Sequence, residues 1–191
     1  MKAIRNIYDT WVRTYRHKKI ISKISLLNPD DTILDLSCGD GLFIDRIHKR
    51  NPNTLLYGID ISEIEIQKAQ RDFPYGHFSV GGVEKLPFEN NSLDVVFCVM
   101  SLHHYKNAES VFSEIKRILK NGGVLYLGDM TPRFLWTQRI ANNHGCYEPY
   151  HFERYYLSTE IKQVMNQAGL LFVKEQSITW FPRVRLFTFK K

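Results

Sequence analysis

The most informative stretch of this sequence is Ile33-Leu34-Asp35-Leu36-Ser37-Cys38-Gly39-Asp40-Gly41-Leu42. Its apolar first half follows Pro29 and two aspartates, and it predicts a short buried strand. The two glycines can adopt positive φ and allow a ligand to approach the backbone closely. Apolar side chains then recur at helical spacing through Ile47, which predicts a helix beginning at residue 40 or 41. A strand, a glycine turn and a helix N-terminus together form a cradle for a polar cofactor.

Three features of this cradle indicate which cofactor it holds. The dinucleotide fingerprint G-x-G-x-x-G is incomplete, because Ile44 stands where the third glycine belongs. Asp35 precedes the turn and would repel a pyrophosphate, so it favours a ligand that carries positive charge. Asp60 ends a second apolar run, 55–59, and a carboxylate there suits the hydroxyls of a ribose. These features predict S-adenosylmethionine rather than NAD.

Further segments strengthen this interpretation when they are taken in order along the chain. They are Ile33 to Gly41, Gly58-Ile59-Asp60-Ile61-Ser62, Leu86-Pro87-Phe88, Leu93-Asp94-Val95-Val96, His103-His104 and Leu119-Lys120-Asn121-Gly122-Gly123-Val124-Leu125. In this order the chain resembles the class I S-adenosylmethionine-dependent methyltransferases over residues 30–130. It is most similar to the small-molecule branch that includes the ubiquinone and menaquinone C-methyltransferases. The resemblance implies methyl transfer to a small molecule, with S-adenosylhomocysteine as product.

The expected fold is an α/β Rossmann-like, seven-stranded, mostly parallel sheet with helices on both faces and a C-terminal antiparallel hairpin. A length of 191 residues suits a single domain of this kind. We expect an N-terminal helical cap over residues 1–28, a cofactor-binding core over 30–130, a substrate lid over 131–157, and a C-terminal helix and hairpin over 158–191. Within this plan the first helix breaks near His17, and a helix over 109–120 ends at the glycines 122 and 123.

Charge and cysteine content restrict the cellular setting. Of the net charge of +6, residues 1–27 contribute +6 and residues 183–191 contribute +4, so the intervening residues are acidic. We interpret the basic first helix as a solvated face, so no nucleic acid is expected as a partner. The three cysteines, Cys38, Cys98 and Cys146, form no C-x-x-C pair, which indicates a reducing compartment. With no membrane span and no secretory signal, the cytoplasm is the expected location, for a monomer or a homodimer.

The resemblance assigns cofactor-binding roles to particular residues. The methionine end lies at the glycine turn, the ribose at Asp60 and the adenine on Ile61. Gly82 stands where similar proteins carry an acid or an amide for the adenine amino group, and a backbone carbonyl there could substitute. The full expected set is Asp35, Ser37, Gly39, Asp40, Gly41, Asp60, Ile61, Gly82, Val83 and Met100.

Residues for catalysis and for substrate binding are expected at the same edge of the sheet. His103 and His104 follow the fourth strand, and one of them could take a proton from the acceptor, unless alignment of the two reactants suffices. An aromatic lid suits a flat, partly apolar acceptor. The expected substrate contacts are Tyr8, Trp11, Tyr15, Trp136, Tyr150 and Tyr155. The spacing of His144, Cys146 and His151 matches no standard zinc site, so no metal is expected.

Three other functions stay open from the sequence. The residue at position 82 would suit a catalytically silent protein that uses the fold to bind or scaffold a partner. The basic first helix would suit an RNA methyltransferase, although the chain lacks the Asn/Asp-Pro-Pro-aromatic motif of that class. A nicotinamide-dependent enzyme is the third alternative.

Overall fold

The computed structural model describes residues 2–24, 27–145, 153–180 and 182–191. Its helices are α1 (Lys2–Lys23), α2 (Leu42–Arg50), α3 (Glu63–Asp72), α4 (Ala108–Ile118), α5 (Leu135–Gly145) and α6 (Ser158–Gln167), with a 3₁₀ turn at Leu102–His104. Its strands are β1 (Thr32–Leu36), β2 (Leu55–Asp60), β3 (His77–Val80), β4 (Leu93–Val99), β5 (Leu119–Met130), β6 (Leu171–Thr179) and β7 (Val184–Lys190). None of the described helices is long and apolar enough to cross a membrane.

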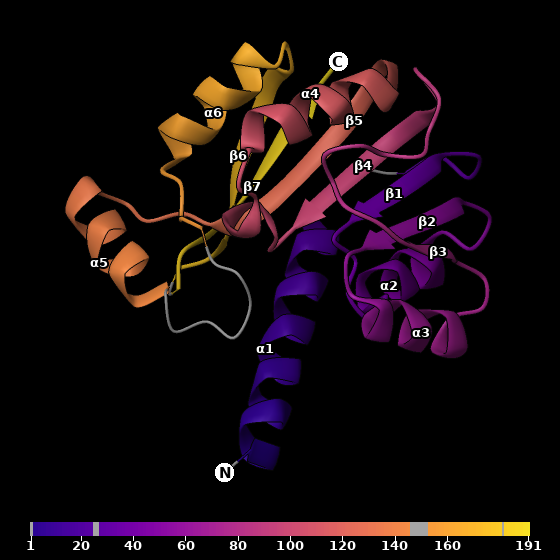
Figure 1. Ribbon diagram of the computed structural model, residues 1–191, viewed down its shortest axis with the longest axis horizontal. Helices are drawn as coiled ribbons and strands as arrows, with labels where there is room; N and C mark the ends of the chain where they lie inside the picture. The colour runs from indigo at the N-terminus through magenta and orange to yellow at the C-terminus, as the bar shows by residue number, and fades with distance from the viewer. Residues whose placement is uncertain (1, 25–26, 146–152, 181) are drawn as a thin grey trace.

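The strands form one sheet in the order β3-β2-β1-β4-β5-β7-β6. The first five strands are parallel, while β7 pairs antiparallel with both β5 and β6. Figure 1 shows α4 and α6 on one side of this sheet and α1, α2 and α3 on the other. The arrangement confirms the predicted fold class, including the C-terminal hairpin.

Two apolar clusters, one on each face, hold the helices against the sheet. One cluster joins α4 and α6 to the sheet, and the other joins α1, α2 and α3 to it. In β1, Leu34 and Leu36 belong to the first cluster and Ile33 belongs to the second. Successive side chains of a strand point to opposite faces, so Asp35 faces the side of α1 and α2. A strand buried on both faces explains the continuous apolar run in the sequence.

Two expectations about element boundaries were wrong, and one segment contains a helix that was not expected. Helix α1 continues through His17, because this residue is buried and its ring packs edge-on against Phe43 at 5.1 Å. Helix α4 ends at Ile118 rather than at the glycines, because Leu119 already pairs with Leu93 of β4. The segment expected to be an aromatic lid contains helix α5. The exposed side chains of Leu135, Trp136 and Ile140 leave this helix without the apolar stripe that would have predicted it.

Helix α1 reaches from the carboxyl edge of the sheet toward its amino edge. Arg13 contacts Asp40 in the glycine turn, and Ile20 packs over Gly128 near the end of β5. The N-terminal half of α1 projects away from the sheet (Figure 1). The helix therefore begins beyond the strand ends and flanks the place where a ligand of this fold would lie.

Candidate active site

The site is built where β1 and β4 end side by side. The chain leaves β1 toward β2 on one side and leaves β4 toward β5 on the other, so the two connections diverge and open a crevice. Ser37 and Met100, the first residues after these strands, adopt φ values of 60° and 56°. Left-handed backbone is uncommon for residues other than glycine and often marks functional sites. Both strand ends are therefore held in a strained conformation at the crevice.

The glycine turn leaves its backbone open to a ligand at one position and packs tightly at another. A Cβ added to Gly39 would meet no atom within 4 Å, so the turn is uncovered there. A Cβ on Gly41 would lie 3.0 Å from both Ala69 and Phe78, and its φ is 78°. Gly41 is required for packing against α3 and β3, whereas Gly39 provides access.

Carboxylates surround this turn. Asp60 accepts hydrogen bonds from the Gly39 N–H at 2.8 Å and from the Ser62 N–H at 2.9 Å. Asp40 is paired with both terminal nitrogens of Arg13, at 3.1 and 2.7 Å. This ion pair between Arg13 of α1 and Asp40 of the turn was not predicted, because nothing in the sequence relates two residues so far apart.

Asp35 is the most strongly perturbed acid of the site. Only 3 % of the residue is exposed, and among the described residues none donates a hydrogen bond to its carboxylate. Burial raises the pKa of Asp35 well above its usual value, and the nearby charges of Asp60 and Asp40 raise it further. A cation bound above the turn would offset these unfavourable interactions and lower the pKa. The carboxylates around the turn therefore favour a positively charged ligand.

The ends of β2 and β3 form a second, more open part of the site. Ile61 is 82 % exposed directly after Asp60. The Gly81 N–H donates to the Asp60 carbonyl at 3.0 Å, which brings the segment containing Gly82 beside the end of β2. Val83 is half-buried and packs against the core, and Met100 is partly buried at the end of β4. Ile61 and the segment containing Gly82 thus lie at the same edge of the sheet.

His103 is fixed by Asp129, the last carboxylate of β5. Its Nδ1 lies 2.8 and 3.1 Å from the two carboxylate oxygens, and its backbone N–H donates to the same group at 3.2 Å. Both residues are buried, at 4 % and 2 % exposure. The ring of His103 also packs against His104 and Tyr155, with centroids 4.1 and 5.2 Å away. In the tautomer that donates from Nδ1, the basic nitrogen is Nε2.

Sequence reasoning found His103 but not its partner Asp129. Asp129 follows the apolar run 124–128, so its place at the end of a strand could be predicted from the sequence, whereas its pairing with His103 could not. His104 is half-buried, and its catalytic role stays a prediction.

The expected substrate residues are only partly brought together. Tyr155 is buried beside His103, whereas Trp136 on α5 is 63 % exposed and stacks with Phe134. Tyr15 on α1 is 42 % exposed, with the Lys19 ammonium 5.6 Å from the centre of its ring. The side chains of Tyr8 and Trp11, and the whole of Tyr150, lie outside the described residues.

Metal ligation finds no support in the part of the chain that the structure describes. No group of three His, Cys, Asp or Glu residues there could hold a metal ion. The three residues considered from the sequence, His144, Cys146 and His151, lie outside the described side chains.

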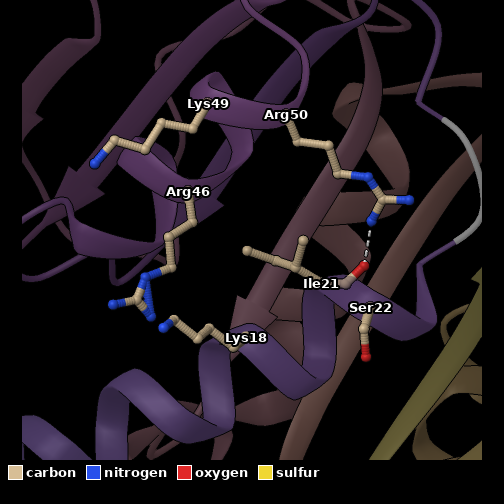
Figure 2. A pocket seen from close by; sticks show the side chains of 6 residues that line it. All are labelled: Lys18, Ile21, Ser22, Arg46, Lys49 and Arg50. Carbon is tan, nitrogen blue, oxygen red and sulfur yellow. Dashed lines mark hydrogen bonds between the residues drawn. The ribbon is translucent and has the colours of Figure 1, made fainter.

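A depression of about 540 Å³ lies between α1 and α2, away from the glycine turn. It is lined by Lys18, Ile21, Ser22, Arg46, Lys49 and Arg50 (Figure 2). The guanidinium of Arg46 donates to Thr14 at 2.9 and 3.1 Å, and that of Arg50 donates to the Ile21 carbonyl. These arginines fasten α1 to α2, so we attribute a structural role to this basic surface.

The architecture and the site together define a class of protein. A glycine turn whose N–H donates to a carboxylate, at the point where an open parallel sheet reverses its strand order, is typical of Rossmann-like folds. Comparison with known proteins gives the family. A family model described as "Methyltransferase domain" matches residues 34–127. The chain therefore contains a methyltransferase domain over these residues.

Individual relatives agree with this assignment. The biotin biosynthesis bifunctional protein BioHC of Teredinibacter turnerae is 30% identical over 159 residues, covering 78% of this chain and 28% of that protein. The demethylmenaquinone methyltransferase of Thermotoga maritima is 27% identical over 129 residues, covering 68% and 56%. This chain therefore spans about a quarter to a half of the length of these relatives.

A solved structure gives the same fold. The SAM-dependent methyltransferase from Aquifex aeolicus superposes with a TM-score of 0.71 at 17% identity, covering 91% of this chain and 88% of that one. At this identity the likeness concerns the fold alone.

Proposed function

We propose that this protein transfers the methyl group of S-adenosylmethionine to a small-molecule acceptor by in-line displacement, releasing S-adenosylhomocysteine. The observation that carries the proposal is the group of carboxylates around an open glycine turn. A buried acid without a described hydrogen-bond donor, beside a backbone position that has free space above it, suits a ligand with a cationic amino-acid end. The bound cofactor would supply a methyl group already activated by a sulfonium.

The residues of the turn fit the parts of this cofactor. Asp35 would attract the ammonium electrostatically without contacting it, since its carboxylate lies beneath the turn. Asp60 would exchange backbone partners for the ribose hydroxyls, and Ile61 offers an exposed apolar side chain to the adenine. Ser37, Asp40, Met100, Gly82 and Val83 complete the proposed cofactor-binding set, with Gly39 and Gly41 giving the turn its shape.

We assign His103 as the proposed general base and Asp129 as the residue that orients it. A hydrogen bond from Nδ1 to a buried carboxylate fixes the ring and stabilises the imidazolium that proton transfer would create. His104 packs against this ring and is the second candidate for the base. Proton removal matters only for an acceptor that carries a hydroxyl, a phenol or an acidic C–H at the attacking atom.

The acceptor is proposed to be a small, partly aromatic molecule. One relative is named for demethylmenaquinone and another for biotin biosynthesis, so members of this family act on small molecules. Tyr155 beside His103, and the exposed Phe134 and Trp136 at the start of α5, offer flat apolar contacts. Tyr8, Trp11, Tyr15, Trp136 and Tyr150 stay proposals as further contacts. The cytoplasmic location and a monomeric or homodimeric state also stay predictions.

A catalytically silent binding protein is the second candidate, because Gly82 supplies no side chain for the adenine amino group. Titration calorimetry of the protein with S-adenosylmethionine, S-adenosylhomocysteine and NAD tests both functions. The proposal expects micromolar binding of the first two ligands, weak or no binding of NAD, and loss of binding in Asp60→Ala. Asp94→Ala is the matched control, since Asp94 lies at the start of β4 and pairs with Lys120. Absence of binding at millimolar ligand would overturn the proposal and favour the silent protein.

A further inference from the structure

A cluster of buried hydroxyl groups connects the ends of β1 and β4 beneath the proposed cofactor site. The Tyr105 hydroxyl lies 3.1 Å from Ser37 Oγ and 3.0 Å from Ser101 Oγ. Cys98 Sγ lies 3.6 Å from the same phenol and 3.3 Å from Ser101 Oγ. Tyr105 is 5 % exposed, so this phenol bridges two strand ends in the interior.

Both strand ends joined by this phenol are strained. Ser37 has a φ of 60°, a conformation that is unfavourable for a residue with a Cβ. Ser101 directly follows Met100, whose φ is 56° and whose N–H donates to the Gly128 carbonyl at 2.7 Å. Strained backbone persists only where surrounding contacts determine it. On the side of β1, the side chain of the strained residue Ser37 is hydrogen-bonded to the Tyr105 hydroxyl.

The conformation of Ser37 controls the turn that follows. The Cys38 N–H donates to the Ile59 carbonyl at 3.0 Å, and the Gly39 N–H donates to Asp60 at 2.8 Å. A change of φ at Ser37 would redirect both N–H groups. It would move the open backbone of Gly39 and the carboxylate of Asp60 away from a common ligand.

The phenol is also suited to act as a permanent donor. Burial raises the pKa of Tyr105 well above its usual value, so the hydroxyl keeps its proton at any working pH. A neutral phenol donates one hydrogen bond and accepts others, which allows it to serve both serine hydroxyls at once.

We propose that Tyr105 is a positioning residue for the cofactor, which holds Ser37 in its left-handed conformation and thereby sets the glycine turn for binding. This inference rests on the proposed function, because the ligand is the proposed cofactor. Tyr105 touches neither cofactor nor substrate in this account. Its effect is expected in cofactor affinity and in the KM for the cofactor, with little change in kcat.

The test compares S-adenosylhomocysteine affinity in the wild type, Tyr105→Phe, Ser37→Gly and the double variant by calorimetry. Tyr105→Phe keeps the ring and removes one hydroxyl, and we expect Kd to rise about tenfold. Glycine adopts positive φ without the penalty of a Cβ. Ser37 belongs to the proposed cofactor-binding set, so the reference for the double variant is Ser37→Gly alone. Adding Tyr105→Phe to Ser37→Gly should change Kd by less than about threefold, because glycine keeps the positive φ without the phenol.

Tyr126→Phe is the matched control, because Tyr126 is equally buried on β5 and lies outside the turn. Its Kd should stay at the wild-type value even if its melting temperature falls. A purely structural role for Tyr105 would give the same pattern as the control, which would overturn the inference. A rise in Kd of about tenfold on adding Tyr105→Phe to Ser37→Gly would also overturn it, because the phenol would then act without holding Ser37. Absence of binding by the wild type would instead overturn the proposed function.

Discussion

At the scale of single residues, His103 combines burial with a fixed orientation. Its Nδ1 and its backbone N–H both contact the carboxylate of Asp129. A side chain held in this way loses little freedom when it takes a proton, so a base at this place needs no rearrangement.

We predict that His103→Gln lowers kcat by about 10²–10⁴-fold, the usual contribution of a general base. The affinity for S-adenosylhomocysteine should stay within a factor of about two, because the glycine turn is untouched. Initial rates with an acceptor found among phenols, quinols and amines provide the measurement. His104→Gln is the control. A larger loss in His104→Gln than in His103→Gln would assign the base to the neighbouring ring.

The two glycines of the turn should respond differently to a methyl group. Gly41→Ala brings a Cβ to 3.0 Å from Ala69 and Phe78 at a φ of 78°, so we expect a loss of about 2–4 kcal/mol in the free energy of unfolding. Gly39→Ala meets no neighbour and should cost about 1–2 kcal/mol, yet it should weaken binding of S-adenosylhomocysteine. Urea unfolding and calorimetry on both variants make the comparison. Equal stability of the two variants would contradict it.

His17 should make the stability of the protein depend on pH. Burial lowers the pKa of His17 to about 3, and the charges of Arg46, Arg13 and Arg16 contribute. Below pH 6.5 His17 binds a proton in the unfolded chain, whereas in the folded protein it binds one only near pH 3. Stability is therefore full above pH 6.5 and falls by at most about 1.4 kcal/mol per pH unit in this window.

The measurement is urea unfolding of the wild type and of His17→Phe at pH 7.5 and pH 4.5. Between these conditions the wild type should lose about 2–3 kcal/mol more than the variant. The substitution also removes a buried Nδ1 that no described residue hydrogen-bonds. The same pH dependence in both proteins would show that His17 is not the responsible group.

At the scale of elements, α1 is attached to the core by polar contacts as well as by apolar packing. Ile20 and Ile24 are buried, while Arg46 and Arg50 of α2 donate to carbonyl oxygens of α1. We predict that Arg46→Met lowers the free energy of unfolding by about 1–3 kcal/mol, because both of its hydrogen bonds to Thr14 are lost.

Lys18→Met is the control for this prediction, since Lys18 lines the same depression (Figure 2) without fastening the two helices. Its effect should stay within about 0.5 kcal/mol. Denaturant unfolding of both variants decides the question. Equal effects would mean that removal of positive charge, rather than loss of the hydrogen bonds, accounts for the change.

The elements most accurately predicted from the sequence are those with a strong periodic pattern. The apolar run 55–59 and the Asp60 that ends it form β2, as expected. Helix α5 was missed, because its apolar residues are exposed and form no core-facing stripe. Its existence depends on contacts across the fold, such as the hydrogen bond from Gln138 to the Tyr155 carbonyl.

Some residues of the candidate site could likewise be predicted from the sequence, and others could not. The glycine turn and Asp60 are close in sequence to strands that the pattern identifies, so they could be predicted. Arg13, Tyr105 and Asp129 act on residues far along the chain, and only the folded sheet brings them into contact. Pairings of this kind carry no signal in a single sequence.

At the scale of the whole molecule, strand order places the site. The order in which strands are added to the sheet reverses between β1 and β4. The glycine turn, the strained strand ends and the buried His103 all lie at the carboxyl edge of these strands. Fold alone does not establish activity. Methyl transfer is proposed because the carboxylates at this edge complement the positive charge of the cofactor.

A crystal structure of the protein with S-adenosylhomocysteine tests this claim most directly. The account predicts the ligand over Gly39, its ribose hydroxyls hydrogen-bonded to Asp60 and its adenine against Ile61. A ligand bound elsewhere, for example in the depression between α1 and α2, would contradict it. The same conclusion would follow if the carboxylate of Asp60 kept its present backbone partners and made no contact with the ribose.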